Sequence, residues 1–191
     1  MFGRIKLALT ILIGVALGLL SARYVAGGGL DLVAMSQGPW KTWPSAGLNT
    51  MDPYTKAHFL AEGRLADNRR EIVEFETAGD GNGSPFDAGC TYLIAGRFGW
   101  SRWWSITASR EGDHASLPPL RPSSLHSGQV VFEADGTAVI RLAADPQTGN
   151  WLAMPSSGRI NLVLRYYDPV PASRANPAAV VLPQVQREAC R

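Results

Sequence analysis

The chain has 191 residues, which suits one domain with an appended segment. Its hydrophobic content of 46% is ordinary for a folded protein, and its net charge is +2. Three basic residues and no acid fall within the first 26 residues, so 15 basic residues stand against 16 acidic ones in the remainder. This nearly neutral body argues against a nucleic-acid-binding protein, which would need a basic face.

An apolar segment begins the chain. Leu7–Ala22 carries no charge and, extended to Ala26, reaches about 20 residues, the length that a helix needs to cross a bilayer. A cleaved signal peptide would also have a basic start, but Tyr24 stands where the cleavage site needs a small residue. We therefore favour an uncleaved transmembrane anchor over residues 1–26 and keep the signal peptide as the alternative.

Charges on both sides of the apolar segment predict its orientation. Arg4 and Lys6 precede the segment and Arg23 follows it, which favours an amino terminus in the cytoplasm. The rest of the chain would then lie in the periplasm of a bacterium as the soluble part of a single-pass inner-membrane protein. Gly27–Gly29 would serve as a flexible joint.

Cys90 and Cys190 are the two cysteines of the chain. The sequence has no CxxC and no His–Cys cluster, so we expect no metal site. In an oxidising compartment two cysteines usually pair, and this pair would close a loop of roughly 100 residues and contribute about 4 kcal/mol. Two independent buried thiols are the alternative.

We expect three parts in the chain: the anchor over 1–26, a linker and surface-packing segment over 27–50, and a β-sandwich domain over 51–191. The second segment looks irregular. Two prolines flank Trp40 and Trp43, and we expect this segment to hold itself against the domain surface with its indoles.

One helix is predicted after the anchor, over Asp52–Leu65. Asp52 can cap the free backbone N–H groups, and Pro53 fits the first helical position. Residues at helical spacing predict one apolar stripe, formed by Tyr54, Ala57, His58, Ala61 and Leu65. His58 lies on this stripe, so we interpret it as a packed, hydrogen-bonded histidine rather than a site residue.

From residue 71 the hydrophobic period changes from helical to two, which is typical of strands. Two alternating runs joined at Asp135–Gly136 also predict a hairpin over Gln129–Ala143. The other predicted strands are 71–78, Cys90–Gly96, Arg102–Ser109 and Gly158–Pro169. Several short strands without intervening helices predict a mostly β protein, an antiparallel sandwich or barrel.

The stretch "GWSRWWSIT" contains two adjacent tryptophans on one predicted strand, so Trp103 and Trp104 should point to opposite faces. Trp104 shares its face with apolar residues and is the predicted core residue. An outward Trp103 could stack on a sugar or a planar ligand. It could equally be covered by the segment that carries Trp40 and Trp43, and we favour this covered arrangement.

Four residues are the predicted ligand-binding candidates: Trp103, Trp151, Arg165 and Tyr167. An Arg165 that faces a cavity could hold an anion. An Arg165 paired with Asp168 or with a glutamate would be structural, which is the interpretation we favour.

Other patterns that could carry chemistry are weak. There is no GxSxG, and His114 and His126 lack the spacing of metal ligands. Asp80 and Asp87 do not have the spacing of a calcium loop. The sequence therefore leaves the catalytic residues, if the protein is an enzyme, unknown, and predicts no metal and no cofactor.

Several separated motifs together resemble a known bacterial family. They are, in chain order, "DPYTKA", "GCTYLIAG" followed by "RWWSIT", "GNWL", "LVLRYYDP" and "LPQVQREAC". Over roughly residues 38 to 190 the chain resembles the family of domain of unknown function 1214 (DUF1214), in its short, membrane-anchored Gram-negative form. The resemblance implies a jelly-roll-like antiparallel sandwich and supplies no reaction or catalytic residue. Such sequences often have Asp-Gly after the tryptophan strand, where this one has "SREGD", so that turn can differ.

The function that fits these observations is a membrane-anchored periplasmic β-sandwich, acting as a binding or envelope-assembly module. One alternative is a hydrolase or sugar-active enzyme with a cleft lined by Trp103, Trp151 and Arg165. Another is an accessory subunit of an inner-membrane complex, since Gly14 and Gly18 have the GxxxG spacing that permits close helix packing. Composition alone also produces such glycine pairs.

Overall fold

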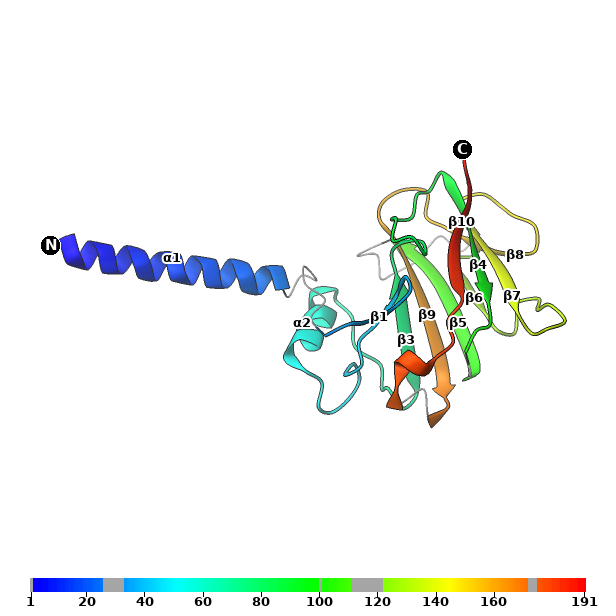
Figure 1. Cartoon of the computed structure of the whole chain (residues 1–191), viewed down its shortest axis with the longest axis horizontal. Helices are drawn as coiled ribbons and strands as arrows, with labels where there is room; N and C mark the ends of the chain where they lie inside the picture. Colours follow the sequence, from blue (N-terminus) through cyan, green and yellow to red (C-terminus); the bar gives the residue numbers. More distant parts are fainter. Residues whose placement is uncertain (1, 26–32, 100, 111–121, 172–174) are drawn as a thin grey trace.

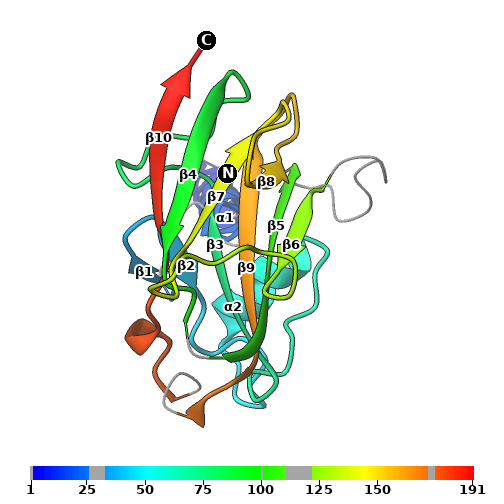
Figure 2. The same cartoon turned by 90° about the vertical axis from the view of Figure 1, so that its right-hand side faces the viewer.

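The computed structural model describes residues 2–25, 33–99, 101–110, 122–171 and 175–191. Trp100 and His114 therefore lie outside the described residues. The domain consists of two stacked sheets, as Figures 1 and 2 show. This mostly β architecture confirms the predicted sandwich.

The larger sheet has six strands in the order β1-β2-β3-β9-β5-β6. These strands are β1 (Met35–Gln37), β2 (Trp40–Thr42), β3 (Ile72–Thr77), β9 (Ile160–Pro169), β5 (Ser101–Arg110) and β6 (Ser124–His126). Alternating apolar residues form β3, β5 and β9, so one face of this sheet packs on the core. The segment predicted to be irregular thus contains the hairpin β1–β2, whose second strand pairs with β3.

The smaller sheet has the order β10-β4-β7-β8. Its strands are β10 (Gln184–Cys190), β4 (Cys90–Gly96), β7 (Ala138–Ala143) and β8 (Asn150–Ala153). All strand pairs in both sheets are antiparallel except β7 and β8, which run parallel with Ile140 opposite Asn150. The six residues 144–149 carry the chain back along the sheet, so that β8 begins at the same end as β7 and runs in the same direction. The expectation of a purely antiparallel sandwich is therefore wrong at this edge.

The hairpin predicted over Gln129–Ala143 is wrong in its first arm. The turn forms, with Gly136 at φ 78°, but only its second arm is a strand, β7. Both edges of β7 are occupied, by β4 and β8. The first arm is held instead by the Asn150 side chain, which accepts from the Val131 amide at 2.8 Å and donates to the Val131 carbonyl at 2.9 Å.

The amino-terminal helix α1 (Phe2–Tyr24) extends away from the sandwich in Figure 1. Within it, Gly3–Tyr24 is a stretch of 22 residues that is long and apolar enough to cross a membrane, and 0% of its most apolar window is buried. A signal sequence would have the same length and composition. The helix is therefore consistent with either an anchor or a signal.

Helix α2 (Pro53–Ala61) confirms the predicted helix and its start, because the Asp52 side chain accepts from the Tyr54 and Thr55 amides. Its buried residues are Thr55 and Phe59 rather than the predicted stripe.

The stripe fails for two physical reasons. The helix packs through Phe59 against Trp43, with ring centroids 5.9 Å apart, which rotates Tyr54 to an exposed position. The helix also ends at Ala61, so Leu65 lies beyond it and is 88% exposed. His58 is packed as expected, with its ring stacked on Trp43 at 4.2 Å. The expected hydrogen bond is not made by its buried Nε2, which has no hydrogen-bond partner among the described residues and lies 3.5 Å from the Glu62 carboxylate.

The core lies between the two sheets and includes Trp104, which is 4% exposed, whereas Trp103 is 37% exposed. This confirms the predicted faces of the two tryptophans. Trp40 is also a core residue, and its indole donates to the Pro183 carbonyl at 2.8 Å. Since Trp40 is inside and Trp43 packs on α2, the expected covering of Trp103 by these two indoles is wrong.

Cys90 and Cys190 form the predicted disulfide, with Cα atoms 4.0 Å apart and a sequence separation of 100. The two residues are also register partners of β4 and β10. Figures 1 and 2 show β10 alongside β4 at the edge of the smaller sheet. The bridge therefore fastens the last strand to the sandwich.

Candidate functional site

Three of the four predicted ligand-binding residues lie on one surface. Trp103 on β5 and Tyr167 on β9 are register partners, with ring centroids 4.7 Å apart. Arg165 lies two residues before Tyr167, on the same face and opposite Ser105. This is the face of the larger sheet that points away from the core.

The structure does not bring Trp151 to this surface. Trp151 is on β8 of the smaller sheet and alternates with Leu152, a core residue. Its side chain therefore lies on the outer face of the other sheet. The indole donates to the Ala143 carbonyl at 3.1 Å. A cleft shared by Trp103, Trp151 and Arg165 does not form.

A small aromatic shelf, formed by Trp103, Tyr167 and His126, occupies the outer face of β9, β5 and β6. The Trp103 ring lies 5.1 Å from the His126 ring, measured between centroids. The hydroxyls of Ser105 and Tyr167 are 3.4 Å apart. Trp103 is the most clearly accessible member, so this shelf offers an indole held on rigid strands next to polar groups.

Arg165 belongs to an ionic cluster beside the shelf, and its Nε lies 2.5 Å from Glu74 Oε2. Arg64, which follows α2, pairs with three carboxylates at once. They are those of Glu62 at 2.9 Å, Glu76 at 2.5 Å and Glu74. Arg64 was not predicted from the sequence. The available indication was that Glu74 and Glu76 lie two residues apart on the outward face of one strand, where a basic side chain is expected to pair with them.

The two strand glutamates of this cluster titrate in opposite directions. Burial raises the pKa of Glu74 to about 7, although Arg165 and Arg64 oppose this. Burial also acts on Glu76, but Arg64 outweighs it, and hydrogen bonds, including one from Asn161 at 3.2 Å, help to lower the pKa of Glu76. Near neutral pH the cluster therefore takes up a proton at Glu74 while Glu76 stays ionised.

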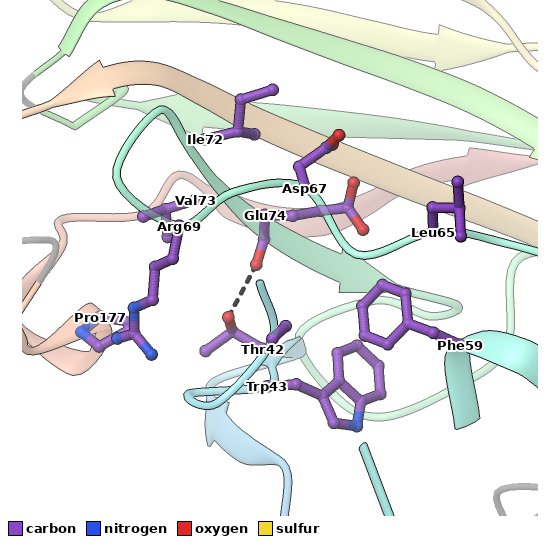
Figure 3. A pocket seen from close by; sticks show the side chains of 11 residues that line it. Thr42, Trp43, Phe59, Leu65, Asp67, Arg69, Ile72, Val73, Glu74 and Pro177 are labelled. Carbon is purple, nitrogen blue, oxygen red and sulfur yellow. Dashed lines mark hydrogen bonds between the residues drawn. The ribbon is translucent and has the colours of Figure 1, made fainter. Parts of the chain in front are cut away.

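Figure 3 shows a hollow on the other side of Glu74, between β2, β3 and α2. The Thr42 hydroxyl donates to the Glu74 carbonyl at 2.8 Å, and the Trp43 and Phe59 rings close the hollow. Its volume is only about 30 Å³, which accommodates one or two water molecules. The hollow is too small for an organic ligand.

A larger opening, the end cleft, lies where β4 ends and β5 begins. It encloses about 450 Å³, which is within the range of small-molecule sites. Phe98 and Trp104, stacked at 4.2 Å, form part of its wall, with Phe132 nearby. Arg97 and Arg102 also line it. None of the four predicted ligand-binding residues lies here. In the sequence, the nearby Arg102 and Trp104 were the features that could have pointed to this cleft.

Among the residues that the structure describes, no group of three or more His, Cys, Asp or Glu side chains could hold a metal ion. The Arg165 guanidinium is engaged by Glu74, and Asp168 lies 3.8 Å from Arg102 rather than beside Arg165. The site geometry therefore offers aromatic contact and hydrogen bonding more readily than an activated nucleophile.

The family model described as a protein of unknown function (DUF1214) matches residues 71–171. The chain belongs to the DUF1214 family. The matched range runs from the start of β3 to just after β9, so it contains the aromatic shelf, Glu74, Glu76 and Arg165. Arg64 and α2 precede it. Comparison with curated proteins gives no match.

Two solved structures are similar to this DUF1214 protein. The VPA0106 protein from Vibrio parahaemolyticus matches with a TM-score of 0.59 at 16% identity, over 74% of this chain and 37% of that one. A putative uncharacterized protein from Burkholderia cenocepacia matches with a TM-score of 0.47 at 17% identity, over 87% of this chain and 39% of that one. The chain thus spans less than two fifths of either protein, and the Vibrio structure supports the fold alone.

The location of the DUF1214 protein follows from two features. The apolar amino-terminal helix is consistent with a signal or an anchor, either of which would direct the chain out of the cytoplasm. A disulfide persists in an oxidising compartment. Together they suggest an extracytoplasmic location.

Proposed function

We propose that this DUF1214 protein is a single-pass inner-membrane protein whose β-sandwich lies in the periplasm and serves as a binding or envelope-assembly module. The observation that carries the proposal is the exposure of α1: its apolar window has no partner within the described structure. A helix that is apolar on all sides is stable in lipid and not in water. Arg4 and Lys6 before the span favour an amino terminus in the cytoplasm.

The aromatic shelf is the proposed binding surface. Trp103 exposes 37% of its surface on a strand, and Tyr167 and His126 support its ring from two sides. A sugar ring or a flat group can stack on such an indole, and the Tyr167 hydroxyl and the partly exposed Arg165 guanidinium, which also pairs with Glu74, lie beside it. Because the shelf is preformed, little side-chain entropy is lost when a ligand binds.

An enzyme is the second candidate, and one observation favours it. Glu74 and Glu76 have pKa values shifted in opposite directions, which is the property of an acid–base carboxylate pair. Arg64 binds both carboxylates, however, so a hydrolytic or sugar-active function would require Arg64 to move away. The same ion pairs equally tie the segment after α2 to the sheet, and we favour this structural role.

Topology and membrane retention test the first proposal. Alkaline phosphatase, which is active only outside the cytoplasm, is fused to the carboxyl end, and green fluorescent protein is fused in parallel. We expect an active phosphatase and a full-length chain that remains in membranes after carbonate washing. An inactive phosphatase fusion together with a fluorescent green fluorescent protein fusion, or a shortened chain free in the soluble fraction, would overturn the proposal.

A further inference from the structure

Exposed apolar side chains gather on the part of the domain that follows the anchor. Of the ten large apolar side chains that the described domain exposes, five lie between residues 35 and 65. Four of them, Leu48, Tyr54, Leu60 and Leu65, surround α2 and are here named the α2 patch. Leu60 is 64% exposed and Leu65 is 88% exposed.

Helix geometry places the patch on the outside. Thr55 and Phe59 are the buried residues of α2 and face the sheet. At 100° per residue, Tyr54 and Leu60 flank the opposite side of this helix, with the small Ala57 and Ala61 between them. One side of α2 is therefore fixed to the domain by aromatic packing, and the other side presents apolar groups outward.

The anchor limits how far this part of the domain can lie from a bilayer. Nine residues separate Val25 from Met35, so the first strand lies at most about 35 Å from the end of α1. Figure 1 shows α2 on the side of the sandwich nearest to α1. An apolar patch held at this place is within reach of the headgroup region of a bilayer spanned by α1.

We propose that the α2 patch is a membrane-contacting surface that lies in the headgroup region of the outer leaflet of the inner membrane. The proposal rests on the anchored topology proposed above. Tyrosine and leucine are typical of such interfaces, where an amphipathic body can be half immersed. The nearby Lys56 is exposed and suits anionic headgroups, while the Glu62 carboxylate is bound by Arg64.

This contact gives the domain a fixed orientation. With α2 on the bilayer, the sandwich stands on its β1–α2 side, and the smaller sheet points away from the membrane (Figures 1 and 2). The ionic cluster around Arg64 ties the segment after α2 to β3 and β9, and β9 also carries Tyr167 of the aromatic shelf.

Photo-crosslinking of the full-length chain tests the proposal. The protein is reconstituted into nanodiscs of phosphatidylethanolamine and phosphatidylglycerol, with p-benzoylphenylalanine in place of Leu60 or Leu65. The matched control carries it in place of Val131, which is 74% exposed and precedes β7, a strand on the side of the sandwich away from α1 (Figure 1). We expect lipid adducts at 60 and 65 to exceed those at 131 by at least about tenfold.

Hydrogen exchange provides a second readout. In nanodiscs we expect Leu60→Asp together with Leu65→Asp to speed amide exchange in α2, because aspartate leaves the headgroup region, whereas Val131→Asp leaves α2 unchanged. Equal lipid adducts at all three positions, or adducts to a second copy of the chain, would overturn the proposal. If carbonate still retains the chain in that case, the anchor stands and only the α2 contact fails. A chain released by carbonate would instead contradict the anchor.

Discussion

Arg165 and Glu74 face each other across β9 and β3, and their ion pair of 2.5 Å joins the central strands of the larger sheet to the Arg64 segment. Arg165 thus has a glutamate partner, which is the structural role that the sequence favoured. Two guanidinium groups flank one buried carboxyl, yet burial dominates and leaves the pKa of Glu74 near 7.

Stability should therefore depend on pH through Glu74. Because the folded-state pKa of about 7 is above the ordinary value of 4.5 for a glutamate, this group stabilises the fold fully below pH 4.5, and its contribution is lost as pH rises through 7. The loss is at most about 3 kcal/mol. We expect the free energy of unfolding to fall between pH 5 and 8, and Glu74→Gln to flatten this fall. Urea unfolding of the protein in detergent micelles, repeated at each pH, measures this free energy.

Glu62→Gln is the matched control, because Glu62 also contacts Arg64 but lies at the exposed edge of the cluster. We expect this variant to keep the decrease in stability between pH 5 and 8. Below pH 4.5 the ionised Glu76, whose pKa is lowered, loses its contribution as it takes up a proton. An unchanged pH profile in Glu74→Gln would assign the decrease to other groups.

Reduction of the Cys90–Cys190 bridge should destabilise the domain by about 4 kcal/mol, because the bridge closes a loop of 100 residues. Unfolding curves with and without dithiothreitol measure this difference. The double variant Cys90→Ser and Cys190→Ser should respond to no reductant. Loss of less than about 1 kcal/mol would mean that pairing of β10 with β4 alone holds the last strand.

Several elements were predictable because they depend on local patterns. Alternation placed Trp104 inside and Trp103 outside, and the Asp52–Pro53 pair marked the start of α2. The Asp135–Gly136 pair likewise predicted the turn, in which Gly136 has a positive φ. The unpaired arm before that turn was not predictable, because it depends on β8 occupying the edge of β7, a contact between separate segments.

The candidate site was predictable only in part, for the same reason. Arg165, Tyr167 and Trp103 share a face through strand alternation and pairing, which the sequence could suggest. Arg64 reaches Glu74 and Glu76 from a segment outside the sheet. Hydrophobic periodicity within one strand or helix gives no information about such a contact between segments. The end cleft is also a product of how the two sheets meet rather than of any motif.

The two adjacent tryptophans should respond differently to truncation. Trp104→Ala removes a core side chain stacked on Phe98 and should cost about 3–5 kcal/mol. Trp103→Ala removes a ring that is 37% exposed and packs on Tyr167, so it should cost less, about 1–2 kcal/mol. Under the proposed contact with a sugar ring, this variant should lose sedimentation with isolated peptidoglycan sacculi, a sugar polymer of the periplasm. Phe132→Ala, an exposed aromatic at the end cleft, is the control that should keep binding. Equal binding by the unmodified protein, Trp103→Ala and Phe132→Ala would show that the aromatic shelf is not the binding site.

Gly99 should be intolerant of a side chain for reasons of space as well as backbone conformation. Its φ is +34°, and an added Cβ would lie 2.8 Å from the ring of Tyr166, a core residue. We expect Gly99→Ala to cost about 2–4 kcal/mol, from positive-φ strain together with the clash. Gly136→Ala separates the two causes, since Gly136 has φ +78° and no atom within 4 Å of the added Cβ. It should cost only about 1 kcal/mol, and equal losses in thermal unfolding would show that the contact with Tyr166 relaxes freely.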